Sequence, residues 1–268
     1  MPTIKTSDAK SLHYEDEGPK DGPPLLFSNS LGTNLAMWDA QAEAALSRGF
    51  RVIRYDQRGH GQSDAPAGEY TMERLGKDIL DLLDALELES TNYCGLSMGG
   101  MAGIWVAMNR PRRFSRAVFA NTAIHFQDRA LWDGRIRTVT EKGMAAIADS
   151  VIERWFTADF REGNAAAVER VKEMILATKR QGYAGCSAAI RDMDMRDRLG
   201  LIEAPVLVVV GAKDPATPPD KGEYIVSHIP GAQIEVLDAA HLSNIEKQAE
   251  FNAVVLDFLA GERHDRHI

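Results

Sequence analysis

The segment 95–99, Gly-Leu-Ser-Met-Gly, carries a serine whose neighbours could make it a nucleophile. A predicted strand at 91–94 precedes it and an apolar helical pattern follows it. A strand before and a helix after are the setting in which the pattern G-x-S-x-G indicates a nucleophile. A nucleophile on so tight a turn needs glycine two residues away on each side, because a Cβ atom there would collide with the backbone. The following helix favours a negative charge at its N-terminus. We therefore predict that Ser97 attacks a carbonyl carbon.

A serine nucleophile needs a histidine that takes its proton and a carboxylate that orients the histidine. In a strand-turn-helix architecture of this kind the acid and then the histidine follow the serine, each at the end of a later strand. Asp214 follows an apolar run that ends at Val210, and His241 follows a run that ends at Leu237. Because parallel strands end at one edge of a sheet, the sequence predicts that Ser97, Asp214 and His241 form a catalytic triad.

Two other residues compete for these roles. Asp238 lies just before His241 and is the alternative orienting carboxylate, although it precedes the turn that would aim it. His60 lies in the glycine-rich loop 56–61 after a strand-like run. Those glycines serve the backbone geometry of the loop, so we expect His60 to make a structural hydrogen bond.

The attack would place a negative charge on the carbonyl oxygen, which two backbone N–H groups must stabilise. The residue after the nucleophile, Met98, supplies one of them. The other is expected from the loop 28–33, after the first long strand. We predict the N–H of Ser30 for this oxyanion hole, with Leu31 as the alternative.

These residues can meet only if strands and helices alternate along the chain. Two N-terminal strands are expected at 3–6 and 12–15. A short apolar run bounded by turn residues predicts a parallel strand at 24–27, and further strands are expected at 51–55, 91–94, 117–121, 206–210 and 233–237. The pattern predicts an α/β fold with a mostly parallel twisted sheet that helices flank on both sides.

Helical spacing of apolar residues fills most of the intervals between these strands. The clearest example is 72–86, where Leu75, Ile79 and Leu82 share one face and Thr71 can cap the N-terminus. Other helices are expected at 37–46, after Ser97 to about 109, and near the C-terminus to about 259. The polar tail 261–268 is expected to fray.

The stretch from about 124 to 196 has a helical pattern and little strand signal. It is too long for a simple loop and short for an independent domain. We predict a helical lid, 124–196, inserted after the fourth parallel strand, with 1–123 and 197–268 forming the core domain.

Composition excludes several other classes of protein. The 268 residues carry a net charge of -8, which argues against a nucleic-acid partner because phosphates require a basic face. The sequence has no run long enough to span a membrane and no apolar signal segment at its start. Cys94 and Cys186 have no metal-ligand spacing and are expected to be buried thiols in a cytoplasmic protein. No cofactor or metal is expected, and the oligomeric state is left open.

Together these motifs resemble the α/β-hydrolase family over nearly the whole chain, including the loop 56–64. The sequence departs from the usual family pattern at Ser28 and Asn29, where most relatives have His-Gly. With the segments 95–101 and 240–246, this departure resembles the 3-oxoadipate enol-lactonases. The resemblance implies hydrolysis of a small carboxylated enol-lactone to 3-oxoadipate during the breakdown of aromatic compounds.

Such a substrate would need a partner for its carboxylate within the lid. The candidates are Arg135 and Arg191, with Trp132 as an apolar wall, although each arginine could equally form a surface ion pair. A general carboxylesterase, a carbon-carbon bond hydrolase of a ring-cleavage product, and a non-catalytic ligand sensor stay open. Dehalogenases and epoxide hydrolases are disfavoured because they need a carboxylate in the place of Ser97.

Overall fold

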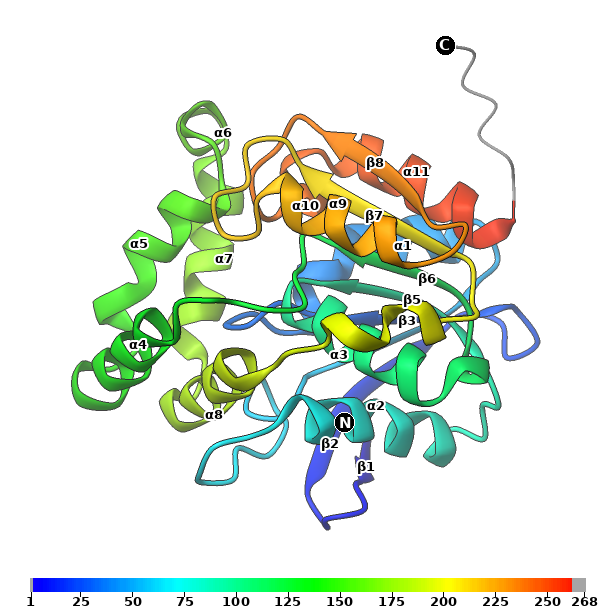
Figure 1. The fold of residues 1–268 in the computed structure, drawn as a ribbon, viewed down its shortest axis with the longest axis horizontal. Coiled ribbons are helices and arrows are strands. Elements are labelled where there is room, and N and C mark those ends of the chain that lie inside the picture. The colour runs from blue at the N-terminus through cyan, green and yellow to red at the C-terminus, as the bar shows by residue number, and fades with distance from the viewer. Residues whose placement is uncertain (1, 262–268) are drawn as a thin grey trace.

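The computed structural model describes residues 2–261; residue 1 and residues 262–268, which hold almost all of the predicted tail, lie outside the described part. Its centre is one sheet with the strand order β1-β2-β4-β3-β5-β6-β7-β8 (Figure 1). The first two strands pair antiparallel and the other six run parallel. The strands are β1 (Thr3–Lys5), β2 (Ser11–Glu17), β3 (Pro24–Ser28), β4 (Arg51–Tyr55), β5 (Thr91–Leu96), β6 (Phe114–Ala120), β7 (Val206–Gly211) and β8 (Gln233–Leu237). The predicted α/β fold is confirmed.

Helices cover both faces of the sheet. Helices α1 (Asp39–Ser47) and α11 (Gln248–Ala260) pack on one face, and α2 (Met72–Ala85), α3 (Met98–Asn109) and α9 (Pro219–His228) cover the other. Short 3-10 turns complete the core at η1 (Leu35–Trp38), η2 (Pro111–Arg113) and η3 (Arg196–Leu201). The predicted helix at 72–86 is confirmed, and its apolar face is buried. The Thr71 hydroxyl accepts the Arg74 N–H at 3.1 Å, as expected of an N-cap.

Helices also fill the interval between β6 and β7. They are α4 (Arg129–Lys142), α5 (Ala145–Trp155), α6 (Ala158–Gly163), α7 (Ala165–Ala177) and α8 (Arg180–Asp192). In Figure 1 α4 to α7 lie on the left, beyond the carboxyl ends of the parallel strands. The insertion therefore covers the sheet edge at which the predicted triad emerges. The division of the chain into core and lid at 124 and 196 stays a prediction.

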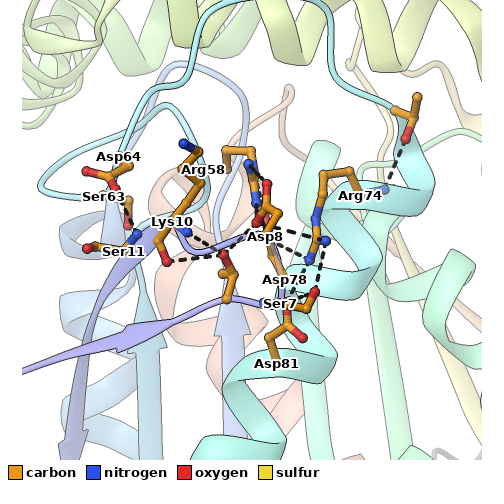
Figure 2. Close-up of polar contacts among 12 residues, drawn as sticks. Ser7, Asp8, Lys10, Ser11, Arg58, Ser63, Asp64, Arg74, Asp78 and Asp81 are labelled. Carbon is orange, nitrogen blue, oxygen red and sulfur yellow. Dashed lines mark hydrogen bonds and ion pairs between the residues drawn. The ribbon is translucent and has the colours of Figure 1, made fainter.

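A network of charged side chains joins the N-terminal hairpin to the core (Figure 2). The guanidinium of Arg58 bonds both oxygens of Asp78 at 2.7 Å and both oxygens of Asp8 at 2.8 Å. Arg74 adds a bond to Asp78 at 3.0 Å. The hydrogen bonds from Arg58 hold the pKa of Asp8 well below its ordinary value, although partial burial opposes this. Arg58 is thus a structural residue that fixes the loop after β4 against α2.

No helix in the range 2–261 is both long enough and apolar enough to cross a lipid bilayer.

Candidate active site

Ser97 stands on a strained turn between β5 and α3. Its backbone has φ 56° and ψ −117°, which is unfavourable for a residue with a side chain. A Cβ atom at Gly95 would lie 2.5 Å from the carbonyl carbon of Gly99, and one at Gly99 would lie 2.1 Å from the Ser28 oxygen. The Ser97 N–H donates to the Ala120 carbonyl at 2.9 Å. The two glycines and the neighbouring strand therefore hold the turn that the sequence predicts.

His241 and Asp214 meet at the carboxyl ends of β7 and β8. The His241 Nδ1 atom lies 2.8 Å from Asp214 Oδ2, and both side chains are buried. His241 and Ser97 line the same pocket. No hydrogen bond joins Ser97 Oγ to His241 among the described residues, and catalytic hydrogen bonds of this kind often tighten only around substrate. The alternative carboxylate, Asp238, is exposed and lies 2.7 Å from Lys213 Nζ.

Asp214 is held ionised by donors that the sequence analysis missed. Its Oδ2 atom accepts from Thr217 Oγ1 at 2.7 Å and from Asn121 Nδ2 at 3.0 Å, in addition to His241. Its Oδ1 atom accepts the N–H groups of Ala216 and Thr217 at 2.8 and 3.0 Å. Burial alone would raise the pKa of Asp214, but His241 and these hydrogen bonds lower it below the ordinary value. The carboxylate is therefore fixed in orientation and charge.

The second oxyanion donor differs from the one predicted. The Ser30 N–H donates to the thioether of Met37 at 3.3 Å, in the protein interior, so the prediction of Ser30 is wrong. The N–H of Leu31 donates to no acceptor among residues 2–261, and Leu31 lines the pocket beside Ser97. The structure therefore favours the alternative, Leu31. Residues 31 and 32 form a turn in which the Thr33 N–H bonds the Ser30 carbonyl at 3.2 Å, and this turn decides which of the neighbouring N–H groups faces the pocket.

His60 supports this loop, as expected from the sequence. The Gly32 N–H donates to His60 Nε2 at 2.9 Å, and His60 Nδ1 lies 3.2 Å from the Arg58 carbonyl. The ring is fully buried, and burial lowers its pKa to about 4. Neutral His60 can accept from Gly32, whereas the protonated ring cannot. The histidine therefore fixes the backbone directly after Leu31.

The pocket at Ser97 has a volume of about 160 Å³. Its walls are mostly apolar and come from the core and from the helices α4, α5 and α8. They include Met101, Phe126, Val151, Trp155, Tyr183 and Ile190. A cavity of this size and lining suits a small molecule whose polar groups meet a few placed partners.

Two arginines and a tryptophan supply polar groups to these walls. Arg135 and Arg154 line the pocket, and neither forms an ion pair with a described carboxylate. Burial and the charge of Arg135 lower the pKa of Arg154. The Arg135 guanidinium lies 4.8 Å from the ring centre of Trp132, whose buried Nε1 has no hydrogen-bond partner. Trp132 is therefore more than the apolar wall that we predicted, because its N–H faces no protein acceptor.

The structure does not bring Arg191 to the pocket, and this prediction is wrong. Its guanidinium bonds the carboxylates of Asp192, Asp133 and Glu69 at 2.7, 2.9 and 3.0 Å. These bonds raise its pKa and satisfy its charge. Arg154, on α5, stands in the pocket instead and was missed, because nothing in its sequence surroundings sets it apart from a surface arginine.

The chain matches a family model described as the alpha/beta hydrolase fold over residues 23–248. It is 41% identical over 250 residues to the protein named 3-oxoadipate enol-lactonase 2 of Acinetobacter baylyi, covering 93% of each chain. It is 41% identical to a solved enol-lactonase of Burkholderia xenovorans, with a TM-score of 0.94 over 97% of this chain and 100% of that one. A solved hydrolase of Pseudomonas aeruginosa is 46% identical, with a TM-score of 0.93 over 96% of this chain and 97% of that chain. The similarity thus includes the sheet and the helical insertion together.

Proposed function

The chain belongs to the α/β-hydrolase fold family of enzymes, and from this premise we propose that it hydrolyses a small carboxylated enol-lactone through an acyl-enzyme on Ser97. One observation carries the proposal: the pocket beside Ser97 and His241 contains two arginines that have no carboxylate partner among the described residues. The enol-lactonase names of two similar proteins support the substrate class.

In the first half of the reaction the Ser97 hydroxyl attacks the lactone carbonyl. His241 Nε2 takes the hydroxyl proton, and Asp214 holds the proton of Nδ1 and stabilises the imidazolium that forms. The N–H groups of Met98 and Leu31 would hold the oxyanion. Met98 is the first residue of α3, so the N-terminal end of that helix adds to the stabilisation.

Collapse of the tetrahedral intermediate breaks the ring C–O bond and releases an enolate. An enolate is a better leaving group than an alkoxide, so this step demands little from a general acid. The leaving oxygen stays attached to the acyl group, because the substrate is cyclic. The enolate takes up the proton that His241 removed from Ser97, which returns His241 to its neutral form. His241 then deprotonates a water molecule that attacks the ester on Ser97 and passes this proton to the departing Ser97 oxygen, and the enol tautomerises to the ketone of 3-oxoadipate. The resemblance to enol-lactonases supports a role for this reaction in the breakdown of aromatic compounds.

The second carboxylate of that product is already present in the lactone and needs its own partner. Arg135 and Arg154 can supply charge-assisted hydrogen bonds, and the free Nε1–H of Trp132 can supply another. An anion there would also offset the burial and the repulsion from Arg135 that together lower the pKa of Arg154. A neutral ester would leave these groups unpaired, which is how such a pocket would discriminate between substrates.

The test compares hydrolysis of the enol-lactone with hydrolysis of neutral p-nitrophenyl acetate. We expect Arg154→Met and Arg135→Met each to raise KM for the lactone by about tenfold, the loss of one charge-assisted hydrogen bond, and to leave KM for the ester within twofold. Arg191→Met is the matched control, because its guanidinium bonds carboxylates outside the pocket. A wild-type enzyme that prefers the neutral ester would contradict the proposal and indicate a general carboxylesterase.

A further inference from the structure

Glu246, the last residue of the short helix α10 (Ser243–Glu246), connects the loop of His241 to the helical insertion. Its Oε2 atom accepts the Ala240 N–H at 3.0 Å and the Thr157 N–H at 3.4 Å. Its Oε1 atom accepts the Thr157 hydroxyl. Thr157 is the N-cap of α6, and Ala240 directly precedes His241. One carboxylate therefore bonds the N–H of the residue before the catalytic histidine and the junction between α5 and α6.

The peptide on the other side of His241 is tied to the same junction. The Leu242 N–H donates to the Trp155 carbonyl at 3.1 Å. The Trp155 ring lies 5.9 Å from the imidazole of His241, with the ring planes 32° apart. The Leu242 N–H is thus bonded directly to the segment 155–157, and the Ala240 N–H is linked to the same segment through Glu246.

The core holds this loop at other atoms. Asn121 Nδ2 bonds the Ala240 carbonyl at 3.2 Å, and the Lys213 N–H bonds the Ala239 carbonyl at 2.9 Å. These contacts fix the carbonyl groups of Ala239 and Ala240, whereas Glu246 fixes the Ala240 N–H. If the carboxylate is removed, the Ala240 N–H loses its acceptor and the link to Thr157 is lost.

We propose that Glu246 is a positioning residue that sets the orientation of the His241 imidazole through Ala240 and Thr157. The proposal rests on the proposed function only in assigning His241 as the base. It makes the segment 155–157 of the insertion part of the support of the catalytic base, in addition to being a wall of the substrate pocket. Glu246 does not line the pocket at Ser97, and it acts through the backbone of Ala240, the residue that precedes the histidine.

The test uses the paired variants Glu246→Ala and Glu246→Gln, with p-nitrophenyl acetate as substrate. Alanine removes the acceptor, and kcat should fall by about 10- to 100-fold at unchanged KM because small misplacements of a base are costly. Glutamine keeps an oxygen for the Ala240 N–H, and its NH₂ can donate to the Thr157 hydroxyl, so kcat should stay within about threefold of wild type. Glu250→Ala is the control. Glu250 is exposed and its carboxylate lies 3.7 Å from Lys247 Nζ, so this substitution should leave kcat unchanged.

A spectroscopic measurement separates positioning from a loss of stability. The Nδ1–H proton that His241 shares with Asp214 should give a low-field ¹H NMR resonance in the wild type and in Glu246→Gln. In Glu246→Ala the same resonance should broaden through exchange with water, at a temperature where the protein is folded. If Glu246→Ala does not fold, Thr157→Val replaces it, with Thr157→Ser as its control.

The proposal is overturned if kcat of Glu246→Ala stays within twofold of wild type. It is also overturned if alanine and glutamine cause equal losses, or if only KM changes. The ester reports on His241 whatever the natural substrate is. If Glu246→Ala is slower than Glu246→Gln on the ester, and the wild type does not hydrolyse the lactone, the lactone is rejected as substrate while the role of Glu246 is supported.

Discussion

Replacing Asp214 with asparagine tests the orientation of the catalytic base. The two carboxylate oxygens accept from five donors, which belong to Asn121, Ala216, Thr217 and His241. An amide has only one acceptor oxygen. If that oxygen takes the place of Oδ1, its NH₂ faces the Nδ1 atom of His241. If it takes the place of Oδ2, its NH₂ faces two backbone N–H groups that cannot become acceptors.

The first orientation costs less, and it selects the wrong tautomer of His241. The imidazole would then accept the amide proton at Nδ1 and carry its own proton on Nε2, where the proton of Ser97 must arrive. Loss of the correct tautomer in a triad lowers kcat by about 10⁴-fold, or about 5 kcal/mol of transition-state stabilisation. The Asn121 amide would also lose its acceptor on Asp214, which costs about 1–3 kcal/mol of folding free energy.

The assay is the steady-state hydrolysis of p-nitrophenyl acetate, together with urea unfolding of the same variants. Asp238→Asn is the matched control, because Asp238 is exposed and pairs with Lys213. Its kcat should stay within about twofold of wild type, since surface pairs contribute little. A loss of less than tenfold in Asp214→Asn, or a larger loss in Asp238→Asn, would refute the assignment of Asp214.

Ser97→Ala should reduce kcat for ester hydrolysis to background. Its free energy of unfolding should stay within about 0.5 kcal/mol of wild type, because the Ser97 hydroxyl makes no hydrogen bond among the described residues. A retained rate of ester hydrolysis would exclude Ser97 as nucleophile. The buried ring of His60 gives a pH dependence, because its pKa falls from 6.5 to about 4 on folding. The unfolded chain then binds the proton first, so this contribution to stability is present above pH 6.5 and is lost as the pH falls toward 4. At about 1.4 kcal/mol per pH unit, the loss amounts to about 3 kcal/mol. Urea unfolding between pH 7 and 4 should show a weaker pH dependence in His60→Gln, and equal slopes would contradict the burial argument.

The meeting of Asp214 and His241 beside Ser97 could be predicted because each of these residues follows a local pattern. The glycines around Ser97 reveal a turn that side chains would block, and the runs before Asp214 and His241 mark strand ends. Strand-end position converts distance along the chain into proximity in space. The structure accordingly places Asp214 and His241 within hydrogen-bonding distance and His241 in the pocket of Ser97.

The lid contacts could not be predicted in the same way. Arg154 and Arg191 both lie on amphipathic helices among acidic residues, and only the packing of α5 and α8 turns one into the pocket and the other toward carboxylates. The choice between Ser30 and Leu31 depends on the direction of a single N–H in a loop. Tertiary packing decides the orientation of these arginines and of this N–H group, and neither orientation produces a periodic pattern in the sequence.

The supporting residues were missed for a related reason. Asn121 and Thr217 hold Asp214 from the residue after β6 and from the loop after β7. Glu246, in α10, holds the N–H of Ala240, the residue before His241. Each is a common polar residue in a turn or a short helix. Its role depends on a partner that is distant in sequence, so only the folded arrangement identifies it.

The central claim, a covalent acyl-enzyme on Ser97, is tested most directly by mass spectrometry of enzyme quenched during turnover of the enol-lactone. Because the ring opens without losing an atom, the trapped enzyme should gain the full mass of the lactone. Peptide mapping should place that mass on Ser97, and the adduct should be absent in Ser97→Ala. Rapid product formation with no adduct, or with an adduct on another residue, would contradict the account.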